Sequence, residues 1–534
     1  MTSTTCGWEL FKSFSIEIET LGITVDFSRA GLSEGFLDEN DGCMQYCFDK
    51  LKELEDGAIA NPDENRQAGH YWLRNPSLAP SAEISQQIEQ AIQMVNSFAH
   101  RVLTGELVGE RGRIIRHMLL IGIGGSSLGP RFLADALCAV DAPIRAHFVD
   151  NTDPDGIDRV LSTLDSELDR TLVVVVSKSG STVETRNGMV EVQIAYEDAG
   201  LSFARHAVAI TQEGSQLDVI RVRDGWVAAF PMWEWVGGRT SVLSAVGLLP
   251  LRLVGVDTDS LLLGAQVCDS ATRVRNVKKN PAALMALAWF LHGEGKGGGQ
   301  MVVLPYKDRL ELFSKYLQQL IMESLGKELD LDGRTVHQGL TVFGNKGASD
   351  QHSYVQQLLD GPNNFIAAFV EVLTDRDMPS VLVDGANTSG DFLQAFLLGT
   401  RQALTERGRS SITITIDRVD ALRLGALIAL FERAVTLYAF LTNINAYHQP
   451  AVEMGKRSAG EIIALKNEIV NFLTDEQGAS YTVEQIAHAL RDKGKAADEE
   501  TVFYLLRRLC MNTQYGIRSE KETSFAGRYW YVDE

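Results

Sequence analysis

The sequence predicts an α/β fold with two units, each a parallel sheet covered by helices, preceded by a helical region and followed by a small appendix. Three observations predict it. Short β-branched runs alternate with helical stretches through the middle of the chain. The chain has 534 residues, too many for one ordinary core. The Gly-rich stretch HGEGKGGG at 292–299 separates two series of predicted strands.

The elements follow in order along the chain. Residues 1–110 are predicted to be mostly helical, since apolar residues recur at helical spacing over 84–102. The first parallel-sheet unit is predicted over 111–290 and the second over 300–465. The apolar runs that predict strands are 117–123, 146–149, 171–176, 207–210, 227–230, 301–304, 380–383 and 412–416. Apolar stripes at helical spacing predict helices over 310–325 and 422–441.

The appendix is predicted over 470–534. Its order of helix, helix and hairpin within 480–534 is typical of a winged helix. The stretch 481–534 holds 8 Lys and Arg and 9 Asp and Glu. Because a DNA-binding domain usually carries a basic face, this balance favours a role in packing or assembly over DNA binding.

Charge and composition narrow the class of protein. The chain has 50 Lys and Arg against 70 Asp and Glu, a net charge of −20. Such a chain is not expected to bind nucleic acid or an anionic membrane through its overall charge. We expect a cytoplasmic protein, since the sequence shows no secretory signal and no uncharged apolar run of membrane-spanning length. The six Cys are scattered without a C-x-x-C pair, which indicates free thiols.

A first candidate site follows the strand at 117–123, where the sequence reads IGIGGSSLGP. Gly125, Ser126 and Ser127 stand in a turn before a predicted helix, and N–H groups at a helix start attract anions. The turn is also a weak dinucleotide fingerprint, because Asp150 ends the next strand but Ser127 replaces the third Gly. A tight turn without a ligand is the third interpretation.

A second candidate follows the strand at 171–176 and reads SKSGSTVET. Hydroxyls and N–H groups at a helix start bind phosphate without a metal. Ordinary helix capping is the alternative, but one hydroxyl would suffice for a cap. A Walker motif is absent from the sequence. Phosphate binding is therefore the favoured interpretation for the loop's hydroxyls and their neighbours, which are Ser177, Lys178, Ser179, Gly180, Ser181, Thr182 and Thr185.

Two further segments supply charged groups. In WEWVGGRTS, Gly238 lets the backbone approach a ligand, and Arg239 offers a fixed cation for a developing oxyanion. Taken alone, such an Arg is more often a structural salt bridge. Gln319 and Glu323 are spaced i,i+4 and share a helix face. Glu323 follows an apolar stretch, so burial and a raised pKa are possible, although a lone Glu is usually solvated.

The last two segments contribute a His and a Lys. His352, in the polar loop GNKGASDQHSY, is a candidate proton carrier, although a plain loop His is the commoner case. In AYHQPAVEMGK, Gln449 fits the cap of a helix and Lys456 shares its face. Lys456 either contacts a substrate oxygen or pairs with Glu453. The motif H-E-x-x-H is absent and the ten His are dispersed, so no metal and no cofactor are predicted.

Together these segments resemble the phosphoglucose isomerase family, of the two-domain sugar-isomerase type. The matching segments, in family order, are IGIGGSSLGP, SKSGSTVET, WVGGRTSVLSAVGL, MESLGK, DQHSY and NAYHQPAVEMGK. They span 119–456, and the last is a strong family signature. Thr240 departs from the family pattern, in which many members have an aromatic residue. The resemblance implies two sugar-isomerase (SIS-type) α/β/α domains. The appendix is similar to the extension of some bacterial and plastid-type enzymes.

The resemblance implies reversible conversion of glucose 6-phosphate and fructose 6-phosphate, by ring opening and a cis-enediol, without a cofactor. Glu323 matches the base, Arg239 the cation beside the enediolate, and His352 and Lys456 the groups that open the ring. The residues that match phosphate and sugar contacts are Gly125, Ser126, Ser127, Ser177, Lys178, Ser179, Gly180, Ser181, Thr182, Thr185, Gly238, Gln319 and Gln449. A homodimer is implied, because in this family the His comes from the partner subunit.

Two alternatives stay open. Another sugar-phosphate isomerase of the same fold, for instance one that also accepts mannose 6-phosphate, would share these motifs. A sugar-phosphate-sensing regulator would use the phosphate loop and the appendix. The presence of Glu323, His352 and Lys456 together argues against such a regulator, because a sensor needs only the phosphate contacts.

Overall fold

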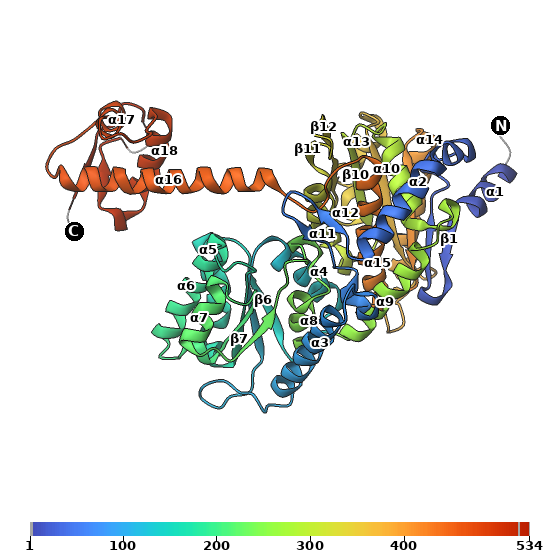
Figure 1. Cartoon of the computed structure of the whole chain (residues 1–534), viewed down its shortest axis with the longest axis horizontal. Helices are drawn as coiled ribbons and strands as arrows, with labels where there is room; N and C mark the ends of the chain where they lie inside the picture. The colour runs from blue at the N-terminus through green and yellow to red at the C-terminus, as the bar shows by residue number, and fades with distance from the viewer. Residues whose placement is uncertain (1–3, 522–523, 533–534) are drawn as a thin grey trace. The chain divides into compact units, whose positions relative to one another are not determined.

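The computed structural model describes residues 4–521 and 524–532. Contacts divide the chain into two compact units, Met1–His448 and Gln449–Glu534. Figure 1 shows that the first unit contains two separate sheets, each with its own covering helices. The domain boundaries within the first unit stay predictions.

The first sheet is wholly parallel, with the strand order β6-β5-β7-β8-β9. Its strands are β5 (His117–Ile121), β6 (Arg145–Val149), β7 (Thr171–Val176), β8 (Ala207–Thr211) and β9 (Ala228–Pro231). Alternate residues enter different cores, as Leu119 and Ile121 pack on one face and Met118 and Leu120 on the other. The nearly continuous apolar strands of the sequence follow from this, because both faces of the sheet are buried.

Two helical layers cover the first sheet (Figure 1). The layer on one face contains α5 (Pro154–Leu164), α6 (Val183–Asp198) and α7 (Gln216–Asp224). The layer on the other contains α3 (Ala82–Leu103), α4 (Leu128–Leu137) and α8 (Ala245–Leu253). The predicted helix at 84–102 is thus confirmed as α3, and all five strands predicted for this sheet are confirmed with small shifts at their ends.

The second sheet has six strands in the order β1-β2-β15-β14-β10-β13. They are β1 (Ser15–Ile18), β2 (Ile23–Asp26), β10 (Gly299–Pro305), β13 (Leu340–Phe343), β14 (Phe365–Val372) and β15 (Ser410–Ile416). The last four are mutually parallel, whereas β2 pairs antiparallel with β15 and β1 with β2. The N-terminal hairpin therefore extends a parallel sheet, which the prediction of a mostly helical 1–110 region did not include.

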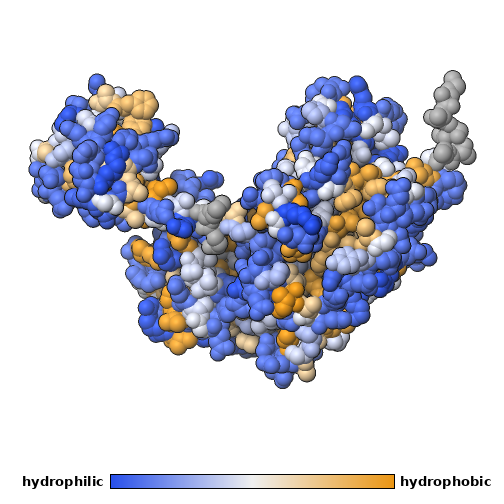
Figure 2. Space-filling model, turned by 45° about the horizontal axis from the view of Figure 1, so that its top comes forward, coloured by the Kyte–Doolittle hydropathy of each residue, from blue (hydrophilic) through white to orange (hydrophobic). Residues whose placement is uncertain are grey.

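A helical core joins the two sheets. It contains α2 (Glu34–Glu55), α9 (Thr258–Thr272), α10 (Pro281–His292) and α15 (Ala421–Leu441). By length and apolar composition α15 alone, among the helices of the described chain, could cross a membrane, but 89% of its most apolar window is buried inside the protein. It confirms the predicted helix at 422–441 as a core element. Figure 2 shows mainly polar residues on one face of the molecule, with apolar ones scattered among them.

Smaller elements complete the first unit. They are α1 (Thr4–Phe14), α11 (Phe313–Leu317), α12 (Gly347–Gln351), α13 (Val355–Asp360), α14 (Ser389–Glu406), and the hairpins of β3 (Ile59–Asn61) with β4 (Arg66–Gln67) and β11 (Lys327–Leu329) with β12 (Thr335–Gln338). α13 and α14 pack on one face of the second sheet.

The second unit contains α16 (Pro450–Asp475), α17 (Val483–Asp492), α18 (Glu499–Met511) and an antiparallel pair, β16 (Ile517–Ser519) and β17 (Tyr529–Tyr531). Its own core joins Ile469 and Leu473 of α16 to both later helices. The predicted order of helix, helix and hairpin is confirmed, while its assignment as a winged helix stays a prediction.

Two predicted elements are wrong. Residues 380–383 form no strand, and Val381, Leu382 and Val383 are more than half exposed. The run has the apolar composition of a strand but does not join a sheet. Within the described chain it forms one isolated β-bridge, from Leu382 to Thr388. The helix predicted over 310–325 is instead a 3-10 turn, α11 and a π-helical segment over Gln318–Glu323.

Candidate active site

The candidate site lies where two loops leave the carboxyl ends of β5 and β7. These strands are neighbours, yet the chain runs from β5 outward to β6 and returns past β5 to β7. Such a reversal opens a crevice at the carboxyl edge of a parallel sheet, where ligands of this fold class bind. The two Gly- and Ser-rich loops of the sequence, 122–127 and 177–182, both begin at this crevice.

Hydrogen bonds fold the Ser-rich loop onto itself. Ser177 Oγ donates to Thr182 Oγ1 at 3.3 Å and accepts from the Gly180 amide at 3.1 Å. Ser179 and Ser181 pair through their hydroxyls at 2.8 Å. Gly180 has a φ of +72°, and an added Cβ would lie 2.1 Å from the amide nitrogen of Leu217. The loop therefore requires glycine at this position.

The capping alternative for this loop can be tested directly. Thr182 occupies the N-cap of α6, but in the described chain its side chain makes no capping hydrogen bond. By contrast, Ser215 caps the next helix by accepting from the Asp218 amide. The Thr185 hydroxyl is buried and has no partner among the described atoms. The first turn of α6 thus keeps donors available for an anion, which favours the phosphate interpretation.

Lys178 connects this loop to the segment that carries Arg239. Its Nζ donates to the carbonyl oxygen of Val236 at 3.4 Å. Burial lowers the pKa of Lys178, while the charge of Glu234 partly opposes that shift. A half-buried cation therefore stands beside the hydroxyls of the loop.

The Gly-rich loop packs tightly against the same segment. A Cβ added at Gly125 would lie 2.0 Å from the carbonyl oxygen of Gly238, so only glycine fits. Ser241 Oγ donates to the Gly238 carbonyl at 2.7 Å and to the Gly125 carbonyl at 3.4 Å. Ser127 is buried at the start of α4 and Ser126 is half-buried. Packing thus explains the glycine at position 125, whereas a Cβ added at Gly238 would have no atom within 4 Å. The contact of either residue with substrate stays a prediction.

The structure argues against the dinucleotide interpretation of this loop, in which the Asp150 carboxylate would accept a hydrogen bond from the ribose. Asp150 accepts a hydrogen bond from Arg131 at 2.8 Å, so its carboxylate is paired within the protein. The turn after β5 is also a short 3-10 helix, Gly124–Ser126, which delays the start of α4. This geometry differs from a strand running directly into a dinucleotide-binding helix.

The π-helical segment Gln318–Glu323 brings a carboxylate to this crevice. Gln319 lies against the Gly-rich loop, as its Nε2 would be 3.0 Å from a Cβ on Gly124. Glu323 ends the segment, and its Oε2 lies 3.5 Å from Nη1 of Arg239. The Glu323 side chain is 23% exposed, so it is accessible from the crevice while most of its surface is buried. π-helical turns are rare and occur often at functional sites.

Arg239 is held rigidly beside Glu323. Its side chain is only 5% exposed, and burial lowers its pKa although Glu323 opposes the shift. Its Nε donates to Ser324 Oγ at 2.9 Å, and its Nη2 donates to the carbonyl oxygens of Ala446 and His448. A buried guanidinium with fixed partners is preorganised to stabilise negative charge that develops next to it.

Lys327 is a site residue that was not predicted from the sequence, although it is the last residue of the segment MESLGK. It is 6% exposed, and its Nζ donates to the carbonyl oxygen of Glu323 at 2.7 Å. Burial and the nearby charge of Arg239 lower its pKa to about 7. A Lys four residues after a Glu was the available signal, because that spacing lets it reach the last carbonyls of the helix.

His352 is exposed at the end of α12. No hydrogen bond or ion pair between described residues joins it to Glu323. The loop before it is ordered by the buried Asp350, which accepts from the Asn345 amide at 3.0 Å and from the Tyr354 hydroxyl. An exposed His on a fixed loop is available to another subunit.

Gln449 and Lys456 belong to the second unit. Gln449 is the N-cap of α16, as predicted, and Pro450 is the first residue of this helix. Lys456 is exposed on that helix. The side chain of Glu453, the alternative partner of Lys456, lies outside the described residues. The contacts of Gln449 and Lys456 with a substrate stay predictions.

No group of three or more His, Cys, Asp or Glu side chains that could hold a metal ion occurs among the described residues. The site instead combines a hydroxyl-rich loop, a rigid guanidinium and a carboxylate. This set suits binding of a phosphorylated compound next to a group that moves protons.

Comparisons with known proteins agree with this chemistry. The family model "Phosphoglucose isomerase" matches residues 45–475. The glucose-6-phosphate isomerase of Desulfitobacterium hafniense (strain Y51) is 56% identical over 517 residues, covering 97% of this chain and 96% of the relative. That of Geobacter sulfurreducens is 53% identical over 514 residues, covering 96% of each.

Solved structures are similar as well. The crystal structure of a glucose-6-phosphate isomerase from Chlamydia trachomatis has a TM-score of 0.78 at 26% identity, covering 87% of this chain and 92% of that one. A hypothetical protein from Thermus thermophilus has a TM-score of 0.66 at 29% identity, covering 80% of this chain and 96% of that one.

Proposed function

Because the chain belongs to the phosphoglucose isomerase family, we propose that it interconverts D-glucose 6-phosphate and D-fructose 6-phosphate in glycolysis and gluconeogenesis. The contact between Glu323 and the buried Arg239 is the observation that carries this proposal. An aldose–ketose isomerisation needs one base that takes a proton from one carbon and returns it to the next. It also needs a fixed cation for the enediolate between the two steps.

Glu323 is the proposed base. It removes the proton from C1 of fructose 6-phosphate and the C1–C2 enediolate forms with its charge on O2. The hydroxyl proton of O1 moves to O2, and the same carboxyl then returns a proton to C2, so that C1 becomes the aldehyde. Arg239 stabilises the negative charge that builds on the enediolate oxygens. Because its guanidinium is already buried and held by carbonyl oxygens, little reorganisation accompanies the reaction.

The Ser-rich loop is the proposed phosphate site. Ser177, Ser179 and Thr182 provide hydroxyls, and the uncapped first turn of α6 provides N–H donors. Lys178 adds a positive charge beside them. Holding the phosphate fixes the sugar relative to Glu323, so remote binding energy is used to orient the reacting carbons.

His352 and Lys456 are the proposed ring-opening groups, and they require a homodimer. His352 is exposed, and no hydrogen bond or ion pair among the described residues joins it to Glu323, which suits a residue that completes the site of a partner subunit. α16 carries the exposed apolar residues Val452 and Ile463 on the face that holds Lys456. Covering this face in the assembled protein would remove apolar surface from water. We place the assembled enzyme in the cytoplasm.

A coupled assay tests the proposed reaction. Purified protein is given fructose 6-phosphate in the presence of EDTA, and glucose 6-phosphate is detected with a dehydrogenase. Glu323→Gln is expected to lower kcat by about 10²–10⁴, the usual contribution of a positioned base. The matched control is Glu328→Gln, an exposed neighbour in β11, which should keep wild-type activity.

Two results would overturn the proposal. Folded wild-type dimer without activity would reject the reaction, and a panel with mannose 6-phosphate would then identify another sugar phosphate. Near wild-type turnover by folded Glu323→Gln would reject Glu323 as the base.

A further inference from the structure

A cavity lies in the first unit, away from the proposed active site. It has a volume of about 720 Å³, within the range of small-molecule sites. Its walls come from α1, the turn after β2, the end of α14 and the start of β15. The lining residues are Gly7, Trp8, Leu10, Phe11, Ser28, Arg29, Gly31, Arg401, Thr405, Gly408, Arg409 and Ser410.

The sheet topology separates this cavity from the catalytic crevice. Strand β15 begins at Ser410, which lines the cavity, and runs parallel to β14 and β10. The cavity therefore lies at the amino edge of these parallel strands. The π-helical segment with Glu323 follows β10, at the carboxyl edge. A ligand in the cavity would not compete with substrate for the same groups.

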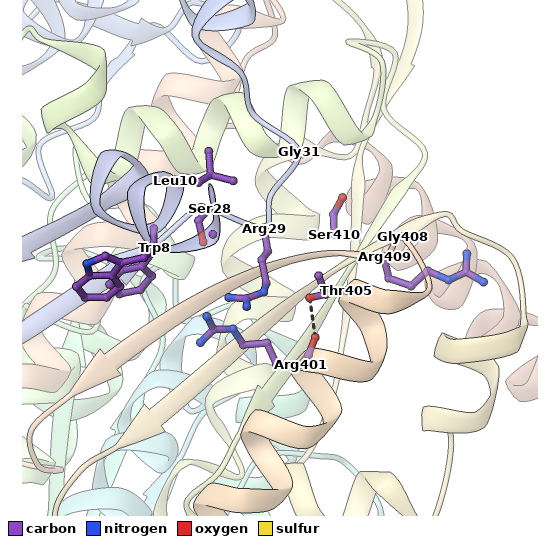
Figure 3. A pocket seen from close by; sticks show the side chains of 12 residues that line it. Trp8, Leu10, Ser28, Arg29, Gly31, Arg401, Thr405, Gly408, Arg409 and Ser410 are labelled. Carbon is purple, nitrogen blue, oxygen red and sulfur yellow. Dashed lines mark hydrogen bonds between the residues drawn. The ribbon is translucent and has the colours of Figure 1, made fainter. Parts of the chain in front are cut away.

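The lining of this cavity is positively charged. Three arginines and no acidic residue stand among the described residues that line it, although the chain as a whole has a net charge of −20. Figure 3 shows the guanidinium groups of Arg29 and Arg401 pointing toward each other, while that of Arg409 points away. Arg409 is held there by the carbonyl oxygens of Leu359 and Gly361, at 3.1 and 2.6 Å.

One carboxylate serves both facing arginines. Asp26 Oδ2 lies 3.1 Å from Nη2 of Arg401 and 3.9 Å from Nη1 of Arg29. Its other oxygen accepts from the Ser28 amide at 2.8 Å. Burial and the like charge of Arg29 lower the pKa of Arg401, and Asp26 and Glu371 only partly oppose this. Glu371 accepts hydrogen bonds from Gln394 and Thr415, so Asp26 is the carboxylate that the two guanidinium groups share as an ion-pair partner among the described residues. An anion in the cavity would add a second partner for these two cations.

An aromatic surface adjoins these cations. Trp8 stacks on Phe11, with ring centroids 5.3 Å apart and planes 11° apart, yet it is 60% exposed. Figure 3 shows Trp8 on the side toward which Arg29 and Arg401 extend. An exposed indole beside guanidinium groups can stack with a planar ring whose phosphates reach the cations.

We propose that this cavity, between Trp8, Arg29 and Arg401, binds a phosphorylated compound with a planar ring, that is, a nucleotide. The phosphates contact the two guanidinium groups and the base stacks on Trp8. This site goes beyond the proposed isomerase activity, whose substrates have no aromatic ring.

Calorimetric titration of the full chain with ATP tests the proposal, in the presence of saturating fructose 6-phosphate so that the catalytic phosphate site is filled. ATP is expected to bind, and Arg29→Met to weaken that binding by about tenfold or more, the loss expected for one charge-assisted contact. Trp8→Ala should weaken it by about tenfold through lost stacking. Both variants should keep wild-type isomerase activity and melting temperature.

Matched controls are available on the surface. Arg223→Met removes an arginine whose side chain is 70% exposed on α7, and Tyr504→Ala removes an aromatic residue with 60% exposure on α18. Both should bind ATP as wild type does. No ATP binding, or equal binding by wild type and Arg29→Met, would overturn the site. Inorganic phosphate binding as tightly as ATP, with Trp8→Ala unaffected, would overturn its assignment to a nucleotide.

Discussion

At the scale of residues, two basic side chains, Lys327 and Arg239, hold the proposed base Glu323. Lys327 holds the backbone carbonyl of Glu323 and Arg239 faces its side chain. The main chain and the carboxylate of the proposed base are thus fixed from different sides. Proton transfer between adjacent carbons requires such positioning, because a small displacement of the base lowers the reaction rate strongly.

The lowered pKa of Lys327 predicts how stability depends on pH. It is about 7 in the folded chain, against an ordinary value of 10.5. Between these values the unfolded chain binds the extra proton, so the free energy of unfolding rises with pH. The contribution of this residue is about 1.4 kcal/mol per pH unit at most. This contribution is measured as the difference in the free energy of unfolding between wild type and Lys327→Met, from urea unfolding at pH 7, 8 and 9.

The control for this measurement is Lys315→Met, an exposed lysine in α11, which should reproduce the wild-type slope. Parallel pH dependences in wild type and Lys327→Met would contradict the lowered pKa.

The candidate residues were predictable to different extents. The Ser-rich loop stands out in the sequence because so many hydroxyls have few structural reasons to cluster, whereas Glu323 was selected through the family resemblance. Gly125 and Gly238 were predicted as ligand contacts, but the tight packing of Gly125 against the Gly238 carbonyl is visible only in the coordinates. Lys327 was missed because its importance lies in burial, and burial depends on the tertiary structure.

At the scale of elements, α2, α9 and α15 are linked by a buried ion-pair network. Asp269 of α9 accepts from Arg74 at 2.7 and 2.8 Å and from Arg433 of α15 at 2.7 Å. Glu55 of α2 also pairs with Arg433. The two arginines hold the pKa of the Asp269 carboxyl well below its usual range, although burial opposes them. The network therefore fixes these helices relative to one another.

Asp269→Asn is expected to destabilise the protein by about 3–5 kcal/mol, because it leaves two buried guanidinium groups without their shared charge. The urea midpoint of the first unit reports the loss. Asp259→Asn, on the same helix with a 66% exposed side chain, is the control and should cost less than about 1 kcal/mol. Equal midpoints for the two variants would show that the network contributes little.

Strands predicted from apolar runs are present where the run is buried and absent where it is exposed. Runs such as 171–176 are buried on both sides and became strands, whereas 380–383 has similar composition but is exposed. The apolar stripe at 310–325 correctly indicated a buried segment. It could not indicate the π-helical turn, because side-chain periodicity does not specify which backbone hydrogen bonds form. β1 and β2 were missed, since a short hairpin beside long helices gives a weak pattern.

At the scale of the whole molecule, the proposed site needs two chains. The fold class was predictable because parallel sheets require apolar strands alternating with helices. A homodimer is implied only by the family resemblance and stays a prediction, since no single-chain pattern reports which surface meets a partner.

Subunit complementation tests the shared site. Glu323→Gln and His352→Ala dimers are each expected to be inactive. After subunit exchange in an equal mixture, about half of the dimers are mixed and each holds one intact site, so about a quarter of wild-type activity should return. His488→Ala, an exposed His on α17, is the control and should be active alone. A mixture that stays inactive after proven exchange would place both residues in the same subunit's site.

Proton transfer through Glu323 is tested by isomerisation in deuterium oxide. Wild-type protein converting fructose 6-phosphate should place deuterium at C2 of glucose 6-phosphate, seen by NMR as loss of the H2 signal. A carboxyl that holds the proton between two steps exchanges part of it with solvent. Glu323→Gln should form product and incorporate deuterium more slowly by about 10²–10⁴, in line with its lowered kcat. Rapid conversion by wild type with no deuterium at C2 would indicate a hydride shift and contradict the enediolate mechanism.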